Sequence, residues 1–315
     1  MKKDPAFLSV CMNPTLQKTL CFSKILPDKV NRTARHRLDA SGKGINVSRV
    51  LTHLGKRVIH LTQLGGSLGP LFLDLCEKDG LDIRWAESGS AVRFCYTLIA
   101  GGEEQDRTVT ELVEEGEPVA AGTEERMLEL YDKLLEEAGT VIISGTKARG
   151  YSEAMVPEMT RRAREKDRRI ILDVRGEDLK RSLPFRPNVI KPNLFEFADT
   201  FAPEFKELGE LSGDEKGVRE RITALALDMA ERFGTDIVLS RGKRPVWYTA
   251  GPGGFAECPV DAVPPVNTIG SGDAFTAGLA AALDDGLPFG EAVARGVRCG
   301  GLNAGFLKPG VIRES

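Results

Sequence analysis

The residues best suited to chemistry lie near the C-terminus, where a Gly-Ser-Gly turn is followed at once by an acid. Gly270, Ser271 and Gly272 precede Asp273, and apolar or small residues then recur at helical spacing. Glycines let a backbone approach an anion closely, and the amides at a helix N-terminus attract negative charge. The turn therefore predicts amides that stabilise a transferring phosphoryl group, with Asp273 as a general base. The alternative interpretation is that Asp273 only caps the helix.

A second sequence suited to an anion is Gly42-Lys43-Gly44-Ile45-Asn46, which we expect to open a helix. Lys43 supplies a positive charge, the flanking glycines admit backbone amides, and Asn46 can bond a hydroxyl or phosphate oxygen. This sequence is not a P-loop, because the P-loop pattern requires a different glycine spacing and a Ser or Thr after the lysine.

Asn193 and Glu196 stand three residues apart at the start of another expected helix. Their side chains would share one face of that helix, where they could orient water around Mg²⁺. The same spacing is typical of a capping box, and for the motif alone this structural interpretation outweighs the metal site. Asp173 is also ambiguous, since it ends an expected strand and either faces a ligand or caps the following turn.

Composition limits the class of protein. The chain has 315 residues, of which 41% are apolar, and a formal net charge of −3, so it can bury a substantial core. Its apolar runs are too short to span a bilayer and its N-terminus lacks a signal-peptide pattern, so we expect a cytoplasmic protein with no membrane partner. The six cysteines lack the spacing of a zinc site, and interleaved charges with few aromatic residues argue against a nucleic-acid partner.

Short β-rich runs alternate with helical runs along most of the chain, which is typical of a mostly parallel sheet covered by helices. Two regions, 18–37 and 92–113, are extended instead, and we expect them to form a small β-sheet that acts as a lid over the carboxyl edge of the main sheet. We expect strands at 6–11, 58–62, 141–144, 170–174 and 237–240, and helices at 44–54, 124–138, 152–166 and 216–233.

Five motifs in this order resemble the PfkB (ribokinase-like) family of carbohydrate kinases, and within it the branch of 1-phosphofructokinases and tagatose-6-phosphate kinases. The resemblance runs almost end to end and implies an α/β fold: one ribokinase-like three-layer α/β/α domain over residues 1–315, with a mostly parallel central sheet and a small β-sheet lid. The matching segments are Met12-Asn13-Pro14-Thr15-Leu16, Gly42-Lys43-Gly44-Ile45-Asn46-Val47, Ser144-Gly145, Lys191-Pro192-Asn193 with Glu196, and Gly270-Ser271-Gly272-Asp273.

The resemblance implies transfer of the γ-phosphoryl group of ATP, with Mg²⁺, to a hydroxyl of a ketohexose phosphate, with Asp273 removing the proton. It implies that Asn193 and Glu196 organise Mg²⁺ largely through water, and that homodimers could form through the lid. The resemblance assigns catalysis to Asp273 together with Gly270, Ser271 and Gly272. It assigns substrate binding to Gln17, Gly42, Lys43, Asn46, Arg93 and Ser144. It assigns nucleotide binding to Lys191, Asn193, Ser240, Gly242, Gly270, Gly272 and Asn303.

Lys43 and Arg93 would hold a phosphate already present on the sugar. Gln17 departs from the branch, which usually has an Asp there, and Cys95 stands where an Asn is common, so we expect an altered sugar preference or weaker sugar binding. Two alternatives stay open: a PfkB kinase of an unphosphorylated sugar or nucleoside, and a non-catalytic sugar-phosphate sensor. Lys43 and Arg93 argue against the first, and Asp273 argues against the second.

Overall fold

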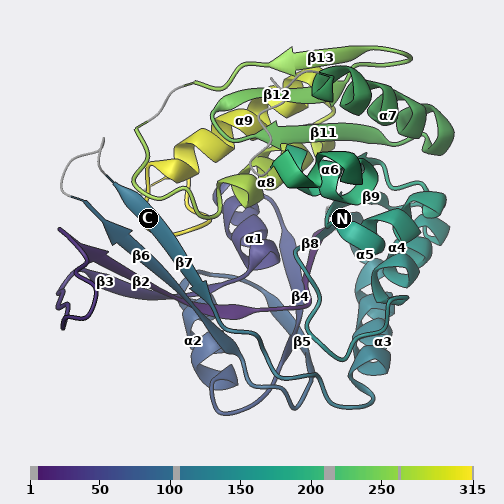
Figure 1. Ribbon diagram of the computed structural model, residues 1–315. Helices are drawn as coiled ribbons and strands as arrows, with labels where there is room; N and C mark the ends of the chain where they lie inside the picture. The colour runs from purple at the N-terminus through teal and green to yellow at the C-terminus, as the bar shows by residue number, and fades with distance from the viewer. Residues whose placement is uncertain (1–5, 102–106, 209–216, 262–263, 314–315) are drawn as a thin grey trace.

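The computed structural model describes residues 6–101, 107–208, 217–261 and 264–313, and every structural statement below concerns these residues. Their largest element is a nine-stranded sheet (Figure 1). Its two outermost strands on one side are antiparallel to their neighbours, and the others are parallel. In spatial order the strands are β13 (Phe255–Cys258), β12 (Arg244–Thr249), β11 (Asp236–Arg241), β10 (Val189–Ile190), β9 (Arg169–Asp173), β8 (Ala138–Ser144), β1 (Ala6–Cys11), β4 (Val58–Leu64) and β5 (Ile83–Glu87).

Helices cover both faces of this sheet, which gives the expected three layers (Figure 1). Successive strand residues point to opposite faces of a sheet, and Ile142 and Ile143 are both fully buried, each in a different apolar cluster. Both faces of the sheet are therefore covered by apolar side chains. One face carries α1 (Lys43–His53), α8 (Ser271–Asp284) and α9 (Phe289–Ala304), and the other carries α3 (Thr123–Leu135), α4 (Met155–Glu165), α5 (Gly176–Ser182), α6 (Leu194–Phe201) and α7 (Val218–Phe233).

Four further strands form a small sheet that stands off the main body (Figure 1). In spatial order they are β3 (His36–Ser41), β2 (Thr15–Phe22), β6 (Arg93–Ala100) and β7 (Thr108–Val113). The β2–β6 pair is parallel, and the outer pairs are antiparallel. The apolar side chains of Leu16 and Ala40 pack with Phe72 of α2 (Gly69–Lys78), which anchors this sheet to the main body.

The small sheet comes from the two regions that the sequence indicates, but its bounds differ from those expected. Its strands reach back to Thr15 and on to Ser41, outside region 18–37, and residues 23–35 form a loop. Residues 102–106 of the second region lie outside the described residues. Because the two extra strand ends adjoin the main sheet, the small sheet contributes side chains to the cavity described below.

The predicted strands and helices are confirmed, with shifts at several ends. The helix expected at 124–138 ends at Leu135, because Ala138 already pairs with Ala6 as the first residue of β8. The helix expected from residue 152 begins at Met155. The helix expected at 216–233 is described from Val218, and residue 216 lies outside the described residues.

Two further findings bear on the class of protein. No helix in the described part of the chain combines the length and the apolar character that a membrane span requires. All six cysteines are buried and carry free thiols.

Candidate active site

A cavity of about 560 Å³ lies between the carboxyl edge of the large sheet and the small sheet. The strands β1 and β9 end at this cavity, and the helices α1 and α8 begin at it. Ser144, Gly242, Ser271 and Asn303 are not among its lining residues. The predicted residues that line it are Gln17, Gly42, Lys43, Asn46, Arg93, Lys191, Asn193, Glu196, Ser240, Gly270, Gly272 and Asp273.

The glycine turn forms the N-terminus of α8. Gly270 is the residue before the helix and has a φ of 84°, and a Cβ there would lie 3.0 Å from the backbone nitrogen of Gly310. The Ser271 amide donates to the Thr268 carbonyl at 3.2 Å, whereas the Gly270 and Gly272 amides have no backbone acceptor among the described residues. The sequence predicts that amides of this turn stabilise a phosphoryl group, and this does not hold for Ser271, whose amide already bonds within the turn.

Asp273 is buried, with 6% of its surface exposed, and lies on the first turn of α8. Its Oδ2 accepts a hydrogen bond from the Asn46 amide at 2.8 Å, and no side chain caps this helix. Burial raises the pKa of Asp273 to about 6; Lys43 opposes this shift and Asp173 adds to it. The carboxylate therefore faces another part of the chain instead of capping its own helix, and its pKa suits a base at neutral pH.

A buried arginine fixes the side chain that holds Asp273. The Asn46 Oδ1 accepts hydrogen bonds from Arg49 Nη1 at 3.1 Å and from Ser41 Oγ at 3.3 Å. Arg49 is 2% exposed and also donates to the Ala40 carbonyl at 2.7 Å. Since the Asn46 oxygen is occupied in this way, its NH₂ group must point toward the carboxylate.

Asp173 joins two lysines at the floor of the cavity. Its carboxylate lies 3.4 Å from Lys191 Nζ and 3.5 Å from Lys43 Nζ, and it accepts a hydrogen bond from Thr276 Oγ1 at 3.2 Å. Burial alone would raise the pKa of Asp173, but Lys191 and Lys43 outweigh burial and hold the pKa below its usual value. The same contact with Asp173 is the main cause that raises the pKa of Lys43, so Asp173 and Lys43 both stay charged at neutral pH.

The small sheet forms the opposite wall. Gln17 is buried and donates from Nε2 to Thr97 Oγ1 at 2.6 Å. Arg93 donates from Nη1 to the Glu114 carbonyl at 2.9 Å, and its Nε is buried with no partner among the described residues. Glu111 also lines this wall, and no described residue bonds to its carboxylate. Both Arg93 and Glu111 therefore keep bonding capacity that a ligand can use.

The Asn193 and Glu196 pair does form a capping box at the start of α6. Asn193 Oδ1 accepts from the Glu196 amide at 2.7 Å, and Glu196 Oε2 accepts from the Asn193 amide at 2.9 Å. The other oxygen, Oε1, lies 3.7 Å from Lys43 Nζ. No group of three or more His, Cys, Asp or Glu side chains in the described ranges could enclose a metal ion.

The predicted residues that do not line the cavity are Ser144, Gly242, Ser271 and Asn303. The side-chain amide of Asn303 donates to the Ile269 carbonyl at 3.0 Å and to Ser271 Oγ at 3.2 Å. Its side-chain oxygen accepts from the Gly310 amide. Asn303 therefore stabilises the glycine turn from outside the cavity. Ser144 is buried with no partner for its Oγ among the described residues, although Gly145 beside it lines the cavity. Gly242 lies in the turn between β11 and β12, away from the cavity lining.

Several residues that line the cavity were not predicted from the sequence. Glu111 is the most notable, and its only sequence signal was its place in an extended segment with mixed polarity. Asp173 was recognised as the end of a strand, but nothing in the sequence indicated its two lysine partners. The other lining residues that were not predicted include Cys11, Asn13, Thr146, Arg175 and Thr268.

Solved structures with the same fold carry related names. A protein of Thermotoga maritima described as a possible 1-phosphofructokinase is 23% identical, with 95% of this chain and 92% of that chain covered and a TM-score of 0.82. The tetrameric inhibited form of phosphofructokinase-2 from Escherichia coli is 19% identical, with 95% and 94% covered and a TM-score of 0.80. Ribokinase of Arabidopsis thaliana, complexed with ribose and ATP, is 16% identical, with 98% and 95% covered and a TM-score of 0.71. These likenesses establish the ribokinase-like fold.

The family itself follows from the sequence match. Residues 10–308 match the pfkB family of carbohydrate kinases, which is nearly the whole chain. The matched residues include the starts of α1 and α8 at the cavity, and Asp273 on the first turn of α8. The chain therefore belongs to the pfkB family of carbohydrate kinases and is a phosphotransferase with an alcohol group as acceptor.

Proposed function

We propose that this kinase transfers the γ-phosphoryl group of ATP to a hydroxyl of a ketohexose phosphate and forms a bisphosphate. The observation that carries the proposal is one cavity in which the buried Asp273 shares the walls with two cations, Lys43 and Arg93. A carboxylate with a raised pKa suits removal of a proton, and two cations suit a phosphate group already present on the acceptor. Such a phosphate would also give the buried Arg93 Nε an acceptor.

In the proposed reaction the acceptor hydroxyl transfers its proton to Asp273. The hydroxyl oxygen forms a bond to the γ-phosphorus while the bond from that phosphorus to ADP breaks. Asn46 holds the carboxylate in place through the 2.8 Å hydrogen bond, and the amides of Gly270 and Gly272 stabilise the negative charge on the phosphoryl group. Asp273 then returns the proton to water after the products leave.

The residues near the nucleotide side fit Mg²⁺ that is held mainly by phosphate oxygens and water. Asn193 and Glu196 offer oxygen ligands. The capping box uses the single side-chain oxygen of Asn193 and Oε2 of Glu196, so Glu196 Oε1 is the carboxylate oxygen left toward the cavity. When bound, Mg²⁺ would neutralise charge on the ATP phosphates. Lys191 and Ser240 line the same side and would contact the nucleotide.

The proposal is tested by ADP formation from Mg·ATP with fructose 1-phosphate, fructose 6-phosphate, tagatose 6-phosphate, fructose, ribose and adenosine. We expect turnover with one or more ketohexose phosphates only, because an uncharged acceptor leaves Lys43 and Arg93 without a phosphate. Turnover confined to fructose, ribose or adenosine would instead identify a kinase of an unphosphorylated acceptor. Sugar-phosphate binding without any turnover would identify a sensor.

Glu111 should contribute to binding of the acceptor. Partial shielding from water raises the pKa of its carboxyl group, and no described cation compensates. A sugar hydroxyl would give it a charge-assisted hydrogen bond, which is worth about 1.5–3 kcal/mol. We expect Glu111→Gln to raise the KM for the acceptor about tenfold while the KM for ATP stays unchanged.

The matched control for this change is Glu115→Gln, which removes the same charge from an exposed residue that does not line the cavity. Steady-state kinetics on the acceptor that the panel identifies would separate the two variants. An equal effect of both changes, or a rise in the KM for ATP alone, would contradict a role of Glu111 in binding the acceptor.

A further inference from the structure

A second cavity of about 610 Å³ lies where the small sheet meets the main body. Its walls are the ends of β2 and β6, the loop at residues 23–35, and the segments around Val266 and Leu307. No described residue lines both this second cavity and the candidate active site. The second cavity is therefore a separate place where a ligand can bind.

The charged residues that line the second cavity in the described part of the chain are all cationic. They are Lys24, Arg32, Arg35 and Arg107, and none of the described residues that line the cavity is an Asp or Glu. Residues 18–37 hold six Lys or Arg and one Asp, although the whole chain has a net charge of −3. Lys24, Arg32 and Arg35 form no ion pair within the described part of the chain. A hollow lined by cations in this way focuses positive potential and attracts anions.

The loop that carries three of these cations is held in a defined shape. The Asn31 side chain bonds both the amide and the carbonyl of Leu26 at 2.9 Å, and also the Lys29 carbonyl at 3.0 Å. Thr33 Oγ1 donates to the Cys21 carbonyl and accepts from the Arg35 amide at 3.0 Å. These bonds fix the backbone beside the cations. Binding of a ligand would therefore cause only a small loss of conformational entropy in the loop.

Arg107 links the second cavity to the segment that leads into the catalytic turn. Its Nη1 donates to the Pro265 carbonyl at 3.0 Å, next to Val266 in the cavity wall. The neighbouring Asn267 is fully buried; it donates to the Leu307 carbonyl at 3.0 Å and accepts from the Ile269 amide at 3.1 Å. A ligand in the second cavity would therefore contact the small sheet and the support of the turn at once.

We propose that the second cavity binds a small molecule that carries one or more phosphate groups. Arginine is suited to this ligand because its planar guanidinium group bonds two phosphate oxygens at once, and three arginines line the cavity. An anion bound there joins the loop at Arg32 and Arg35 to Arg107 and holds the small sheet against the main body. This site differs from the catalytic one and does not depend on which acceptor the kinase uses.

The test measures binding of inorganic pyrophosphate to the full chain by titration calorimetry, without Mg²⁺, nucleotide or sugar. We expect two binding sites per chain in the native protein, because Lys43 and Arg93 offer the other one. The double variant Arg32→Gln and Arg35→Gln should weaken one site at least about tenfold, which is the loss expected for charge-assisted hydrogen bonds. The variant Lys43→Gln should weaken the other site and leave the second cavity unchanged.

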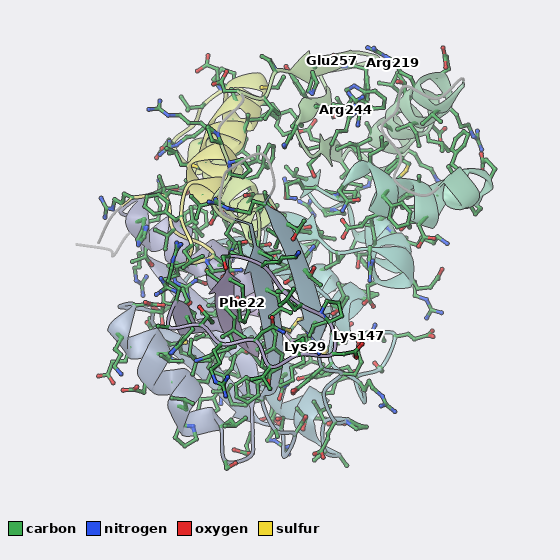
Figure 2. All side chains as sticks on the ribbon, turned by 60° about the vertical axis from the view of Figure 1, so that its left-hand side comes forward. Phe22, Lys29, Lys147, Arg219, Arg244 and Glu257 are labelled. Atoms are coloured by element: carbon green, nitrogen blue, oxygen red, sulfur yellow. The ribbon has the colours of Figure 1, made fainter. Side chains whose placement is uncertain are left out.

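The matched control is Lys29→Gln, which removes one charge from the same loop but does not line the second cavity. Figure 2 brings the small sheet toward the viewer and labels both Lys29 and Phe22, and only Phe22 lines the cavity. Lys29→Gln should bind pyrophosphate like the native protein. A single site in the native protein, no effect of the double variant, or an equal loss with Lys29→Gln would overturn the proposal.

Discussion

Replacement of Asp273 by Asn is expected to lower kcat by about 10²- to 10⁴-fold and, at the same time, to make the folded protein more stable at neutral pH. The loss of activity follows from removal of the proposed base. The gain in stability follows because burial disfavours the charged carboxylate, which raises its pKa from 3.8 to about 6 in the folded protein. A shift of this size corresponds to a cost on the order of 2–3 kcal/mol for the ionised form, and a neutral Asn avoids it.

The effect of Asp273→Asn on stability depends on pH, because the pKa of Asp273 differs between the folded and the unfolded protein. The folded protein binds the Asp273 proton more tightly than the unfolded chain, so the stabilisation by this proton is complete below pH 3.8 and lost above about pH 6. Urea unfolding of the protein without ligands should therefore show a larger advantage of Asp273→Asn at pH 8 than at pH 5. The kcat/KM of the native enzyme should also fall as the pH drops through about 6. If Asp273 served only its own helix, the variant would be no more stable than the native protein at pH 8.

Replacement of Asp173 by Asn is expected to have the opposite effect on stability. This change leaves the buried Lys191 ammonium without its carboxylate, and loss of one partner of a buried ion pair costs about 3–5 kcal/mol. The folded pKa of Asp173 lies below its unfolded value, so its contribution is present above pH 3.8 and is lost as the pH falls through the folded pKa. Urea unfolding at pH 7.5 measures the effect.

A suitable control for Asp173→Asn is Asp74→Asn, because Asp74 pairs with Lys78 on an exposed helix surface at 2.7 Å. Such a pair contributes about 0.3–0.5 kcal/mol. A loss of stability below 1 kcal/mol for Asp173→Asn would contradict the prediction, because the buried Lys191 would then not depend on this carboxylate. If both aspartate predictions hold, Asp173 is a structural counterion, whereas Asp273 is kept charged for its chemistry at the expense of stability.

Local sequence features were sufficient to predict how each part of the site begins. The glycine turn before Asp273, the helix start at Lys43 and the capping box at Asn193 all depend on residues within one helical turn. Backbone preferences and hydrogen bonds over such short distances act the same way in most folds. The alternation of strands and helices likewise indicated the parallel sheet and its carboxyl edge.

Tertiary structure decided which of these parts meet. Asn46 and Asp273 are far apart in the sequence, and their hydrogen bond exists only because α1 and α8 begin at the same cavity. Lys191 and Lys43 converge on Asp173 because of the order of the strands, which depends on packing of the whole core.

The small sheet shows most clearly which contacts cannot be predicted from the sequence. The alternation of side chains along a strand indicates that residues such as Glu111 share a face, but not what that face meets. Pairing of β6 with both β2 and β7 brings Glu111 to the acceptor wall, and the loop between β2 and β3 brings its arginines to the second cavity. The sequence alone therefore determined the fold class, the family and the local motifs. The charge pairs and the second cavity depend on contacts between distant segments, which only the folded chain brings together.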